Sequence, residues 1–336
     1  MQSGQTVIAL TGPYNPAMKH ALYEALPPGF SVVEVASEHE YAKLRDADYV
    51  ILRTLRYGAE TFADSPRLKM LAKYGVGFDT IDVAAASARN IPVVICTGIN
   101  SQSVAEMTVL QMLAACRNLL PLSTGLKNGM WIKDKYTDVS HTLGGKTIGL
   151  VGLGSIGGRV AHIVRAFGAS VIYYSRTRLP KVRERELGLL YAPLDELLAT
   201  ADIVSLHVPG SAETRNLLCR ERIGAMKPGA ILVNNSRGFV VDQDALVEAL
   251  QAGTIRAAAL DVFAEEPPTG SPLLHMENVV PTPHIAGATA GLDLAMVRQC
   301  LEHIVCFHTK QPVPRRNVVN FGQLPDPSVI RCEELP

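Results

Sequence analysis

A glycine-rich turn at residues 152–157 is the segment of this 336-residue chain whose spacing indicates chemistry most directly. It reads GLGSIG, follows the apolar run 147–151 and opens a predicted helix that extends to about residue 167. Gly152 allows a tight turn, Gly154 lets the backbone approach a pyrophosphate, and Gly157 lets the helix pack against the strand. The helix N-terminus adds N–H groups and a positive dipole. The turn predicts dinucleotide contacts at Gly152, Gly154, Ser155, Ile156 and Gly157.

The end of the next predicted strand bears on which dinucleotide binds. NAD-binding folds usually place a carboxylate about 20 residues beyond the glycines, where it accepts from the ribose hydroxyls. Here the strand ends in Ser175, Arg176, Thr177 and Arg178. Arginine offers charge-assisted donors to a 2′-phosphate, and no carboxylate repels it. The sequence therefore favours NADP over NAD, with contacts at Ser175, Arg176 and Thr177, although solvated loop arginines are the alternative.

Two series of strands and helices must position these residues. Short β-branched runs alternate with helical stretches, an order typical of parallel sheets. The first series has predicted strands at 6–10, 31–35, 49–52, 70–74 and 93–96, with helices at 16–26 and 80–89 among them. The second has predicted strands at 147–151, 170–174, 203–207, 230–234, 257–260 and 279–280. We expect an α/β protein with two doubly wound parallel-sheet domains.

The connections between the two series predict the domain boundaries. A helix is predicted over 104–120, with Ser103 and Glu106 in the spacing of a capping box. A helical stretch over 288–308 is expected to return to the first unit. The first domain would then comprise 1–100 and 286–336, around a dinucleotide-binding domain at 101–285. From Gln311 onward, five prolines and no periodicity predict an extended surface tail.

Composition narrows the classes of partner. The chain has 32 basic and 32 acidic residues, so its formal net charge is zero. It therefore has no overall positive charge that would attract nucleic acid or an anionic membrane. There is no run of 18 apolar residues, and the first six residues lack the order of a signal peptide, so we expect a cytoplasmic protein. The six cysteines form no C-x-x-C pair and the histidines no H-E-x-x-H pattern, which predicts no metal site.

Seven segments, in this order, resemble the D-isomer-specific 2-hydroxyacid dehydrogenases. They are KYGVGFD at 73–79, SVAE at 103–106, the glycine turn, NSRG at 235–238, LDVF at 260–263, EP at 266–267 and TPHI at 282–285. The resemblance implies a Rossmann cofactor domain inserted in a flavodoxin-like substrate domain. It also implies reduction of small 2-keto acids to D-2-hydroxy acids with a nicotinamide cofactor, in a cleft between the domains.

The resemblance also assigns catalytic roles, which can be checked against the chemistry. Reduction of a 2-keto acid needs a hydride donor, a proton donor and a cation for the carboxylate and the polarised ketone. Arg237 would be the cation, because its planar fork can hold both oxygens. His284 would donate the proton, since imidazole titrates near neutrality. Glu266 would orient that ring and favour imidazolium.

Further contacts are implied by the same resemblance. The backbone at Val76 and Gly77 would bind the substrate carboxylate, and Arg53 would face the group on the substrate's third carbon. Asp261 would meet the nicotinamide carboxamide, with a turn cap as the alternative. The other implied cofactor contacts are Thr108, His207, Val208, Pro209, Asn235, Ser236 and Gly287. Residues 104–120 and 125–136 would form the contact of a homodimer.

Two rival functions stay open, and so does the substrate. A formate dehydrogenase shares the arginine and histidine but resembles Gln-Pro where this chain has Glu266-Pro267, and the carboxylate argues against it. A dinucleotide-sensing transcriptional corepressor of the same fold would bind NADH tightly and reduce keto acids poorly. Glyoxylate, hydroxypyruvate and longer keto acids, phosphorylated or not, are all compatible with the sequence.

Overall fold

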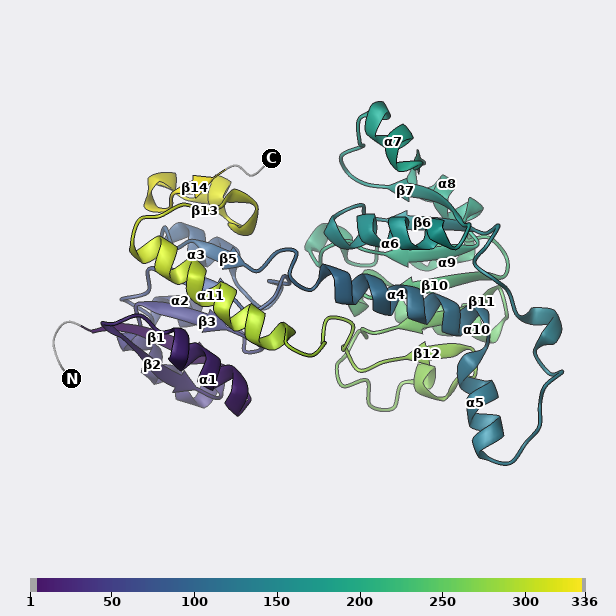
Figure 1. Cartoon of the computed structure of the whole chain (residues 1–336), viewed down its shortest axis with the longest axis horizontal. Coiled ribbons are helices and arrows are strands. Elements are labelled where there is room, and N and C mark those ends of the chain that lie inside the picture. The colour runs from purple at the N-terminus through teal and green to yellow at the C-terminus, as the bar shows by residue number, and fades with distance from the viewer. Residues whose placement is uncertain (1–4, 334–336) are drawn as a thin grey trace. The chain divides into compact units, whose positions relative to one another are not determined.

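The computed structural model describes residues 5–333, and the chain divides into two compact units. Unit 1 comprises residues 1–100 and 289–336, and unit 2 comprises residues 101–288. Unit 1 therefore contains both the purple and the yellow ends of the chain in Figure 1. Residues 1–4 and 334–336 lie outside the described part, so most of the segment considered for a signal peptide is not described.

Unit 1 is built on a five-stranded parallel sheet. Its order is β2-β1-β3-β4-β5, which is the flavodoxin-like order. The strands are β1 (Thr6–Thr11), β2 (Phe30–Val35), β3 (Tyr49–Leu52), β4 (Met70–Lys73) and β5 (Val93–Ile95). The strand order reverses between β1 and β3, where open α/β sheets place their ligand crevice.

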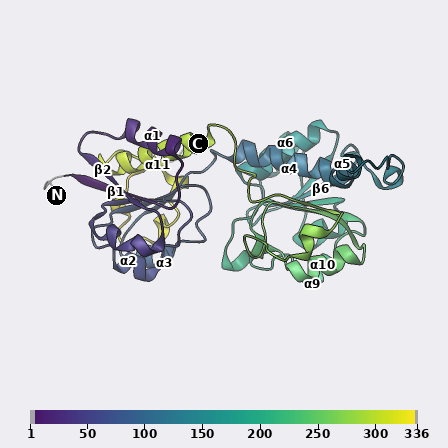
Figure 2. The same ribbon diagram turned by 90° about the horizontal axis from the view of Figure 1, so that it is seen from below.

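Helices cover both faces of this sheet. Figure 2 shows α1 (Pro16–Ala25) and α11 (Leu292–His308) on one face and α2 (Ala59–Ala63) and α3 (Val83–Ala88) on the other. Successive strand side chains point to opposite faces. Ile8 and Leu10 of β1 accordingly pack in the cluster with α1 and α11, whereas Ala9 packs in the cluster with α2 and α3 and with the 3-10 helix η1 (Glu38–Asp46).

The segment after α11 corrects the prediction of an extended surface tail. Strand β13 (Val313–Pro314) pairs with β14 (Cys332–Glu333), and three 3-10 helices lie between them, at Arg315–Asn317, Phe321–Gln323 and Pro327–Val329. Val318 and Ile330 are buried in the core of unit 1. Asn320 accepts from the Val93 backbone N–H at 2.9 Å and donates to the Ile91 carbonyl at 2.9 Å. These hydrogen bonds satisfy backbone groups in and before β5, the edge strand of the sheet. Isolated residues such as Val318, Asn320 and Ile330 hold this segment to unit 1, and isolated residues produce no periodic pattern in the sequence.

Unit 2 contains a seven-stranded parallel sheet of order β12-β11-β10-β9-β6-β7-β8. The strands are β6 (Thr147–Val151), β7 (Ser170–Tyr174), β8 (Leu190–Tyr191), β9 (Ile203–Leu206), β10 (Ala230–Asn234), β11 (Ile255–Leu260) and β12 (Val279–Pro281). Counted from β6, this is the Rossmann order with one further edge strand. The α/β class with two doubly wound parallel sheets is confirmed.

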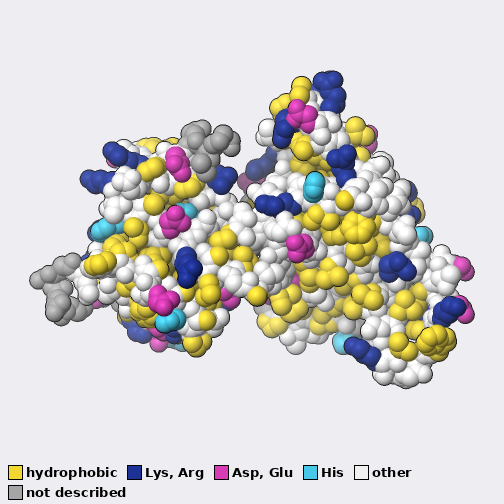
Figure 3. Space-filling view, viewed as in Figure 1, with side chains coloured by type: hydrophobic (Ala, Val, Ile, Leu, Met, Phe, Trp, Pro, Cys, Tyr) yellow, Lys and Arg dark blue, Asp and Glu magenta, His cyan; other side chains and the backbone are white. Residues whose placement is uncertain are grey.

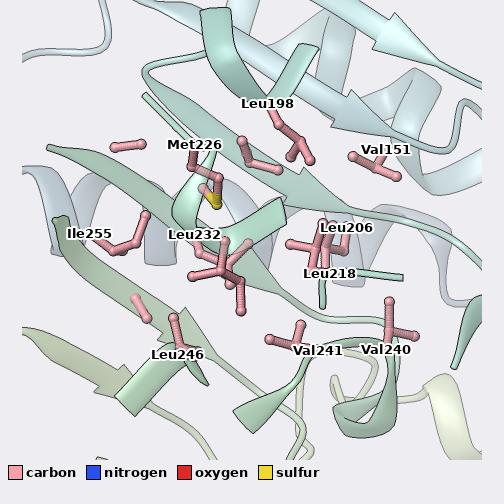
Figure 4. Close-up of a cluster of buried hydrophobic side chains, with 14 of the residues drawn as sticks. Val151, Leu198, Leu206, Leu218, Met226, Leu232, Val240, Val241, Leu246 and Ile255 are labelled. Carbon is pink, nitrogen blue, oxygen red and sulfur yellow. The ribbon is translucent and has the colours of Figure 1, made fainter. Parts of the chain in front are cut away.

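The helices of unit 2 also form two layers. Figure 2 shows α4 (Ser101–Cys116) and α6 (Ser155–Ala166) on one face of the sheet and α9 (Arg220–Gly224) and α10 (Gln243–Gln251) on the other. The core of the second layer, drawn in Figure 4, brings Leu206 and Leu232 from the strands against Leu246 of α10. Unit 2 also contains α7 (Lys181–Leu187) and α8 (Leu194–Thr200). Its 3-10 turns include those at Thr137–Val139, Ala212–Thr214, Gly238–Val240 and Pro272–His275.

The helix predicted over 104–120 has different ends in the structure. It begins at Ser101, so Ser103 lies within the first turn and the predicted capping box with Glu106 is wrong. The helix ends at Cys116, and Asn118 adopts a left-handed conformation with φ of 51° before α5 (Leu119–Lys127). Within the described residues, no helix has both the length and the apolar character needed to cross a lipid bilayer.

Candidate active site

The glycine turn lies after β6, where the strand order of unit 2 reverses. Gly152 has φ of 101°, and a Cβ there would lie 2.5 Å from the His207 carbonyl oxygen. A Cβ at Gly157 would lie 2.3 Å from the Gly152 oxygen, whereas one at Gly154 would meet nothing within 4 Å. Packing thus requires glycine at two positions, and the third leaves open space before the helix. The turn fits the pyrophosphate of a dinucleotide.

The start of α6 and the loop after β9 border the glycine turn. Helix α6 begins at Ser155 with Gly154 as its N-cap, so Ser155 and Ile156 lie in the first turn, where backbone N–H groups lack helical partners. Val208 and Pro209 follow β9 on the adjacent loop. Burial lowers the pKa of His207 to about 4, and its Nε2 lies 3.0 Å from Ser205 Oγ. His207 is therefore a neutral packing partner of the turn.

The two arginines that favoured NADP have different environments. Arg178 makes two hydrogen bonds to the Glu184 carboxylate, at 2.7 and 2.8 Å, and lies over the Tyr191 ring. This pairing lowers the pKa of Glu184 to about 2. Arg176 is exposed and, within residues 5–333, forms no hydrogen bond or ion pair. Of the two side chains, Arg176 is the one available to a ligand, with Ser175 and Thr177 on either side.

The turn that carries Arg237 follows β10 and is held by Asn234. The buried Asn234 Oδ1 accepts from the backbone N–H and the hydroxyl of Ser236, at 3.0 and 2.7 Å. Its Nδ2 donates to the Arg237 carbonyl at 2.9 Å. The Arg237 guanidinium donates to the Ser236 carbonyl, and its charge acts on both Glu266 and His284. The turn therefore presents a fixed cation beside an acid–base pair.

Glu266 and His284 form that pair. Glu266 Oε2 lies 2.7 Å from His284 Nδ1, and Glu266 Oε1 accepts from the Phe263 backbone N–H at 3.1 Å. The hydrogen bond to Glu266 raises the pKa of His284, against the opposing effects of burial and Arg237. Burial alone would raise the pKa of Glu266, but the hydrogen bond and charge of His284 lower it. The imidazole is thus oriented and favoured in its protonated form.

Asp261 holds the backbone that presents His284. Its buried carboxylate accepts from the N–H groups of Ile285 and Ala286, at 2.9 and 2.8 Å. Its carbonyl accepts from the His284 N–H at 2.8 Å, and His284 adopts a left-handed φ of 52°. Such a conformation costs about 1–3 kcal/mol in a non-glycine residue and persists where surrounding contacts enforce it. Asp261 therefore caps this turn, as the alternative interpretation of the sequence expected, and its contact with the nicotinamide stays a prediction. The half-buried Gly287 follows this turn.

Helix α4 supports both loops through two buried polar residues. Gln111 Nε2 donates to Thr282 Oγ1 at 2.9 Å, and Thr282 donates to Asp261 at 2.5 Å. Thr108 accepts from Asn235 Nδ2 at 2.9 Å and donates to the Val104 carbonyl. Thr108 is completely buried and its hydroxyl positions Asn235, while the expected contact of Thr108 with the nicotinamide stays a prediction. Sequence reasoning missed Gln111, whose only signal was a polar residue among apolar neighbours.

The predicted substrate residues of unit 1 lie at the carboxyl ends of β3 and β4. The Arg53 guanidinium donates to the Pro13 carbonyl and lies 5.6 and 5.4 Å from the centres of the Tyr14 and Tyr74 rings. Val76 and Gly77 follow Gly75, which has φ of 125° and whose carbonyl accepts from the Cys96 N–H. The fixed Arg53 and the glycine loop are thus separate features of one sheet edge.

The side chains of the site in unit 2 can transfer a proton and bind an anion. The pair Glu266–His284 can hold a proton, and Arg237 can bind a carboxylate or a carbonyl oxygen. Within residues 5–333, no three His, Cys, Asp or Glu side chains lie together in a way that could hold a metal ion. The glycine turn fits a dinucleotide, so the elements present match a nicotinamide oxidoreductase.

Comparisons with known proteins agree with this geometry. Residues 109–286 match the family model described as D-isomer specific 2-hydroxyacid dehydrogenase, NAD binding domain. The chain is 38% identical to a glyoxylate reductase of Thermococcus onnurineus over 85% of this chain and 88% of that protein. It is 42% identical to a D-3-phosphoglycerate dehydrogenase of Methanocaldococcus jannaschii over 87% of this chain and 56% of that protein.

A solved structure extends the similarity over both units. The D-lactate dehydrogenase of Aquifex aeolicus, complexed with NAD and lactic acid, superposes with a TM-score of 0.79 at 30% identity, covering 90% of this chain and 95% of that one. The family match spans the unit that carries the glycine turn, Arg237, Glu266 and His284. The chain belongs to the D-isomer specific 2-hydroxyacid dehydrogenases, an NAD-dependent oxidoreductase family that reduces 2-keto acids to 2-hydroxy acids.

Proposed function

We propose that this chain reduces small 2-keto acids to D-2-hydroxy acids, with Arg237, Glu266 and His284 as its catalytic residues. The observation that carries the proposal is the 2.7 Å hydrogen bond between Glu266 and His284, beside the charge of Arg237. A bound nicotinamide dinucleotide supplies the hydride. The Gly152–His207 packing and the open space at Gly154 support binding of that cofactor at the glycine turn.

In this proposal each polar group has one task. Because Glu266 occupies Nδ1 of His284, Nε2 is the nitrogen that carries the proton offered to the substrate's carbonyl oxygen. Arg237 binds the substrate carboxylate and polarises the ketone. The backbone N–H groups at Val76 and Gly77 also donate to the substrate carboxylate. Arg53 contacts the group on the substrate's third carbon and so contributes to substrate specificity. Cytoplasmic residence stays a prediction from the sequence.

The first prediction concerns the proton donor. His284→Ala should lower kcat for 2-keto acid reduction by about 10² or more, the usual scale of general acid catalysis. Binding of NADPH should persist, because the glycine turn is intact. The measurements are steady-state kinetics with a panel of 2-keto acids and cofactor titration by fluorescence.

A matched control is His20→Ala, which removes another histidine paired with a glutamate, at 3.2 Å, on the surface of unit 1. This variant should keep normal kinetics. A near-normal rate for His284→Ala would remove the proton-donor role. Tight NADH binding by the unmodified protein without turnover would instead favour the corepressor-like function.

We further propose that NADP is preferred over NAD. The support is the exposed Arg176, which lies next to Ser175 and, within residues 5–333, forms no hydrogen bond or ion pair, although its charge acts on Glu213. No carboxylate lies at the end of β7. A 2′-phosphate would receive charge-assisted hydrogen bonds from Arg176 and donors from Ser175 and Thr177. Arg178 is engaged with Glu184 and takes no part in this proposal.

The second prediction tests this preference. Arg176→Ala should lower kcat/KM with NADPH roughly tenfold, the value of one charged hydrogen bond, and leave NADH kinetics nearly unchanged. Ser175→Asp should shift the preference toward NADH, because a carboxylate accepts from the ribose hydroxyls and repels a phosphate. Arg183→Ala, which removes an exposed arginine of α7, is the control. Better use of NADH than NADPH by the unmodified protein would overturn the preference.

We also propose a homodimer built on α4, α5 and the segment after α5. Figure 3 shows hydrophobic side chains gathered over α4 and α5 of unit 2. Leu126 is 58% exposed and Trp131 81% exposed, and Leu110 and Met130 are also exposed. Exposed apolar side chains gathered on one face mark an interaction site, and a two-fold axis would pair this face with itself.

The third prediction follows from these exposures. Leu126→Asp should shift the sedimentation equilibrium of the protein from dimer toward monomer, because a charge would be buried in the interface. Leu190→Asp, which changes a 68% exposed leucine of β8, should leave the dimer intact. A monomeric unmodified protein at micromolar concentration would contradict the proposal.

A further inference from the structure

A second concave site lies in unit 2 at the amino ends of the strands, whereas the glycine turn lies at their carboxyl ends. A cavity of about 220 Å³ is lined by residues at the amino ends of four strands. Lys146 precedes β6, Asp202 precedes β9, Gly229 precedes β10, and Arg256 is the second residue of β11. The dinucleotide turn, Arg237 and His284 all follow carboxyl ends. A five-residue strand spans about 16 Å, so the cavity is separate from the candidate active site.

The cavity has more positive than negative charge. Asp202 is already paired, since Oδ1 lies 2.7 Å from Lys227 Nζ and Oδ2 accepts from the Thr147 N–H at 2.8 Å. Within residues 5–333, neither Lys146 nor Arg256 forms an ion pair. Lys146 and Arg256 thus leave an excess of positive charge on the cavity wall.

The guanidinium of Arg256 is incompletely satisfied. It donates to two backbone carbonyls, those of Val139 and Ala115, while its buried Nε has no partner. Burial lowers the pKa of Arg256, although a guanidinium stays charged at neutral pH. A half-buried guanidinium with an unsatisfied Nε and no acidic partner is unfavourable, so an anion in this cavity would stabilise it.

The pKa of His141 responds to the charges that line the cavity. Burial lowers the pKa of His141, and the charges of Lys146 and Arg256 lower it further, while Asp202 acts in the opposite direction. The apolar side chains of Ile203 and Ile231, from β9 and β10, also line the cavity. The lining therefore combines cationic and hydrophobic side chains. Its volume is that of about seven water molecules, enough for a small organic ion.

We propose that this cavity binds a small anion that carries a carboxylate or a phosphate, held by Lys146 and Arg256 over Ile203 and Ile231. The site is independent of the reduction chemistry and of the dinucleotide turn. Because the ligand would contact the amino ends of the strands whose carboxyl ends carry the catalytic loops, it is placed to stabilise unit 2.

The experiment is an NMR titration of the imidazole of His141 in the full-length protein, with inorganic phosphate in one arm and succinate in the other, at constant ionic strength. An anion beside His141 opposes the two cations, so either ligand should raise the pKa of His141 in a saturable way. The signal is local, and phosphate bound at the glycine turn does not contribute to it. A response to phosphate alone or to succinate alone identifies the ligand class.

Two variants keep the test decisive. Lys146→Met should weaken the phosphate or succinate affinity at least tenfold, and it breaks no hydrogen bond of the fold, unlike Arg256→Met. Arg183→Met removes the same charge from α7 and should leave the titration unchanged. The proposal is wrong if neither anion shifts His141, or if the shift survives in Lys146→Met. It is also wrong if the His141 signal changes with protein concentration alone, which would make the cavity an interface between copies.

Discussion

The hydrogen bond between Glu266 and His284 is the interaction on which the candidate active site depends. It works only because a second carboxylate, Asp261, holds the His284 backbone in a left-handed turn that the residue would not adopt unaided. The two acids have separate tasks: Asp261 fixes the position of the ring, and Glu266 fixes its orientation and favours its charge. Gln111 and Thr282 extend this support into the core of unit 2, so the reactive side chain rests on a rigid helix.

Much of this arrangement could be predicted because parallel sheets impose it. All strands of a parallel sheet point the same way, so loops far apart in the sequence meet at one edge. The apolar runs predicted the strands at 147–151, 170–174 and 230–234 with their observed ends. The turn after the first of these had to contain glycine, because side chains at Gly152 and Gly157 would collide with backbone atoms. The dinucleotide turn and its neighbours therefore follow from local sequence.

The remaining features depend on contacts that local sequence does not encode. Nothing near Arg178 distinguishes it from Arg176, yet a glutamate six positions later engages only Arg178. The partner of the buried Thr108 hydroxyl is the distant Asn235. Asn320 accepts from the backbone N–H of Val93 in β5, although Asn320 lies more than two hundred residues further along the chain. The break at Asn118 combines a left-handed backbone, which asparagine tolerates, with a hydrogen bond from Asn118 Nδ2 to Ser140 Oγ at 3.1 Å. In each case a tertiary partner decides the outcome.

The most direct test of the central claim is an NMR titration of His284 in the protein without ligands, compared with Glu266→Gln. We expect the pKa of His284 to lie above the ordinary value of about 6.5 and to fall in the variant, because an amide cannot stabilise imidazolium as a carboxylate does. The ring would then lose its proton at lower pH in Glu266→Gln. A pKa of His284 at or below the ordinary value, unchanged by the substitution, would contradict the account.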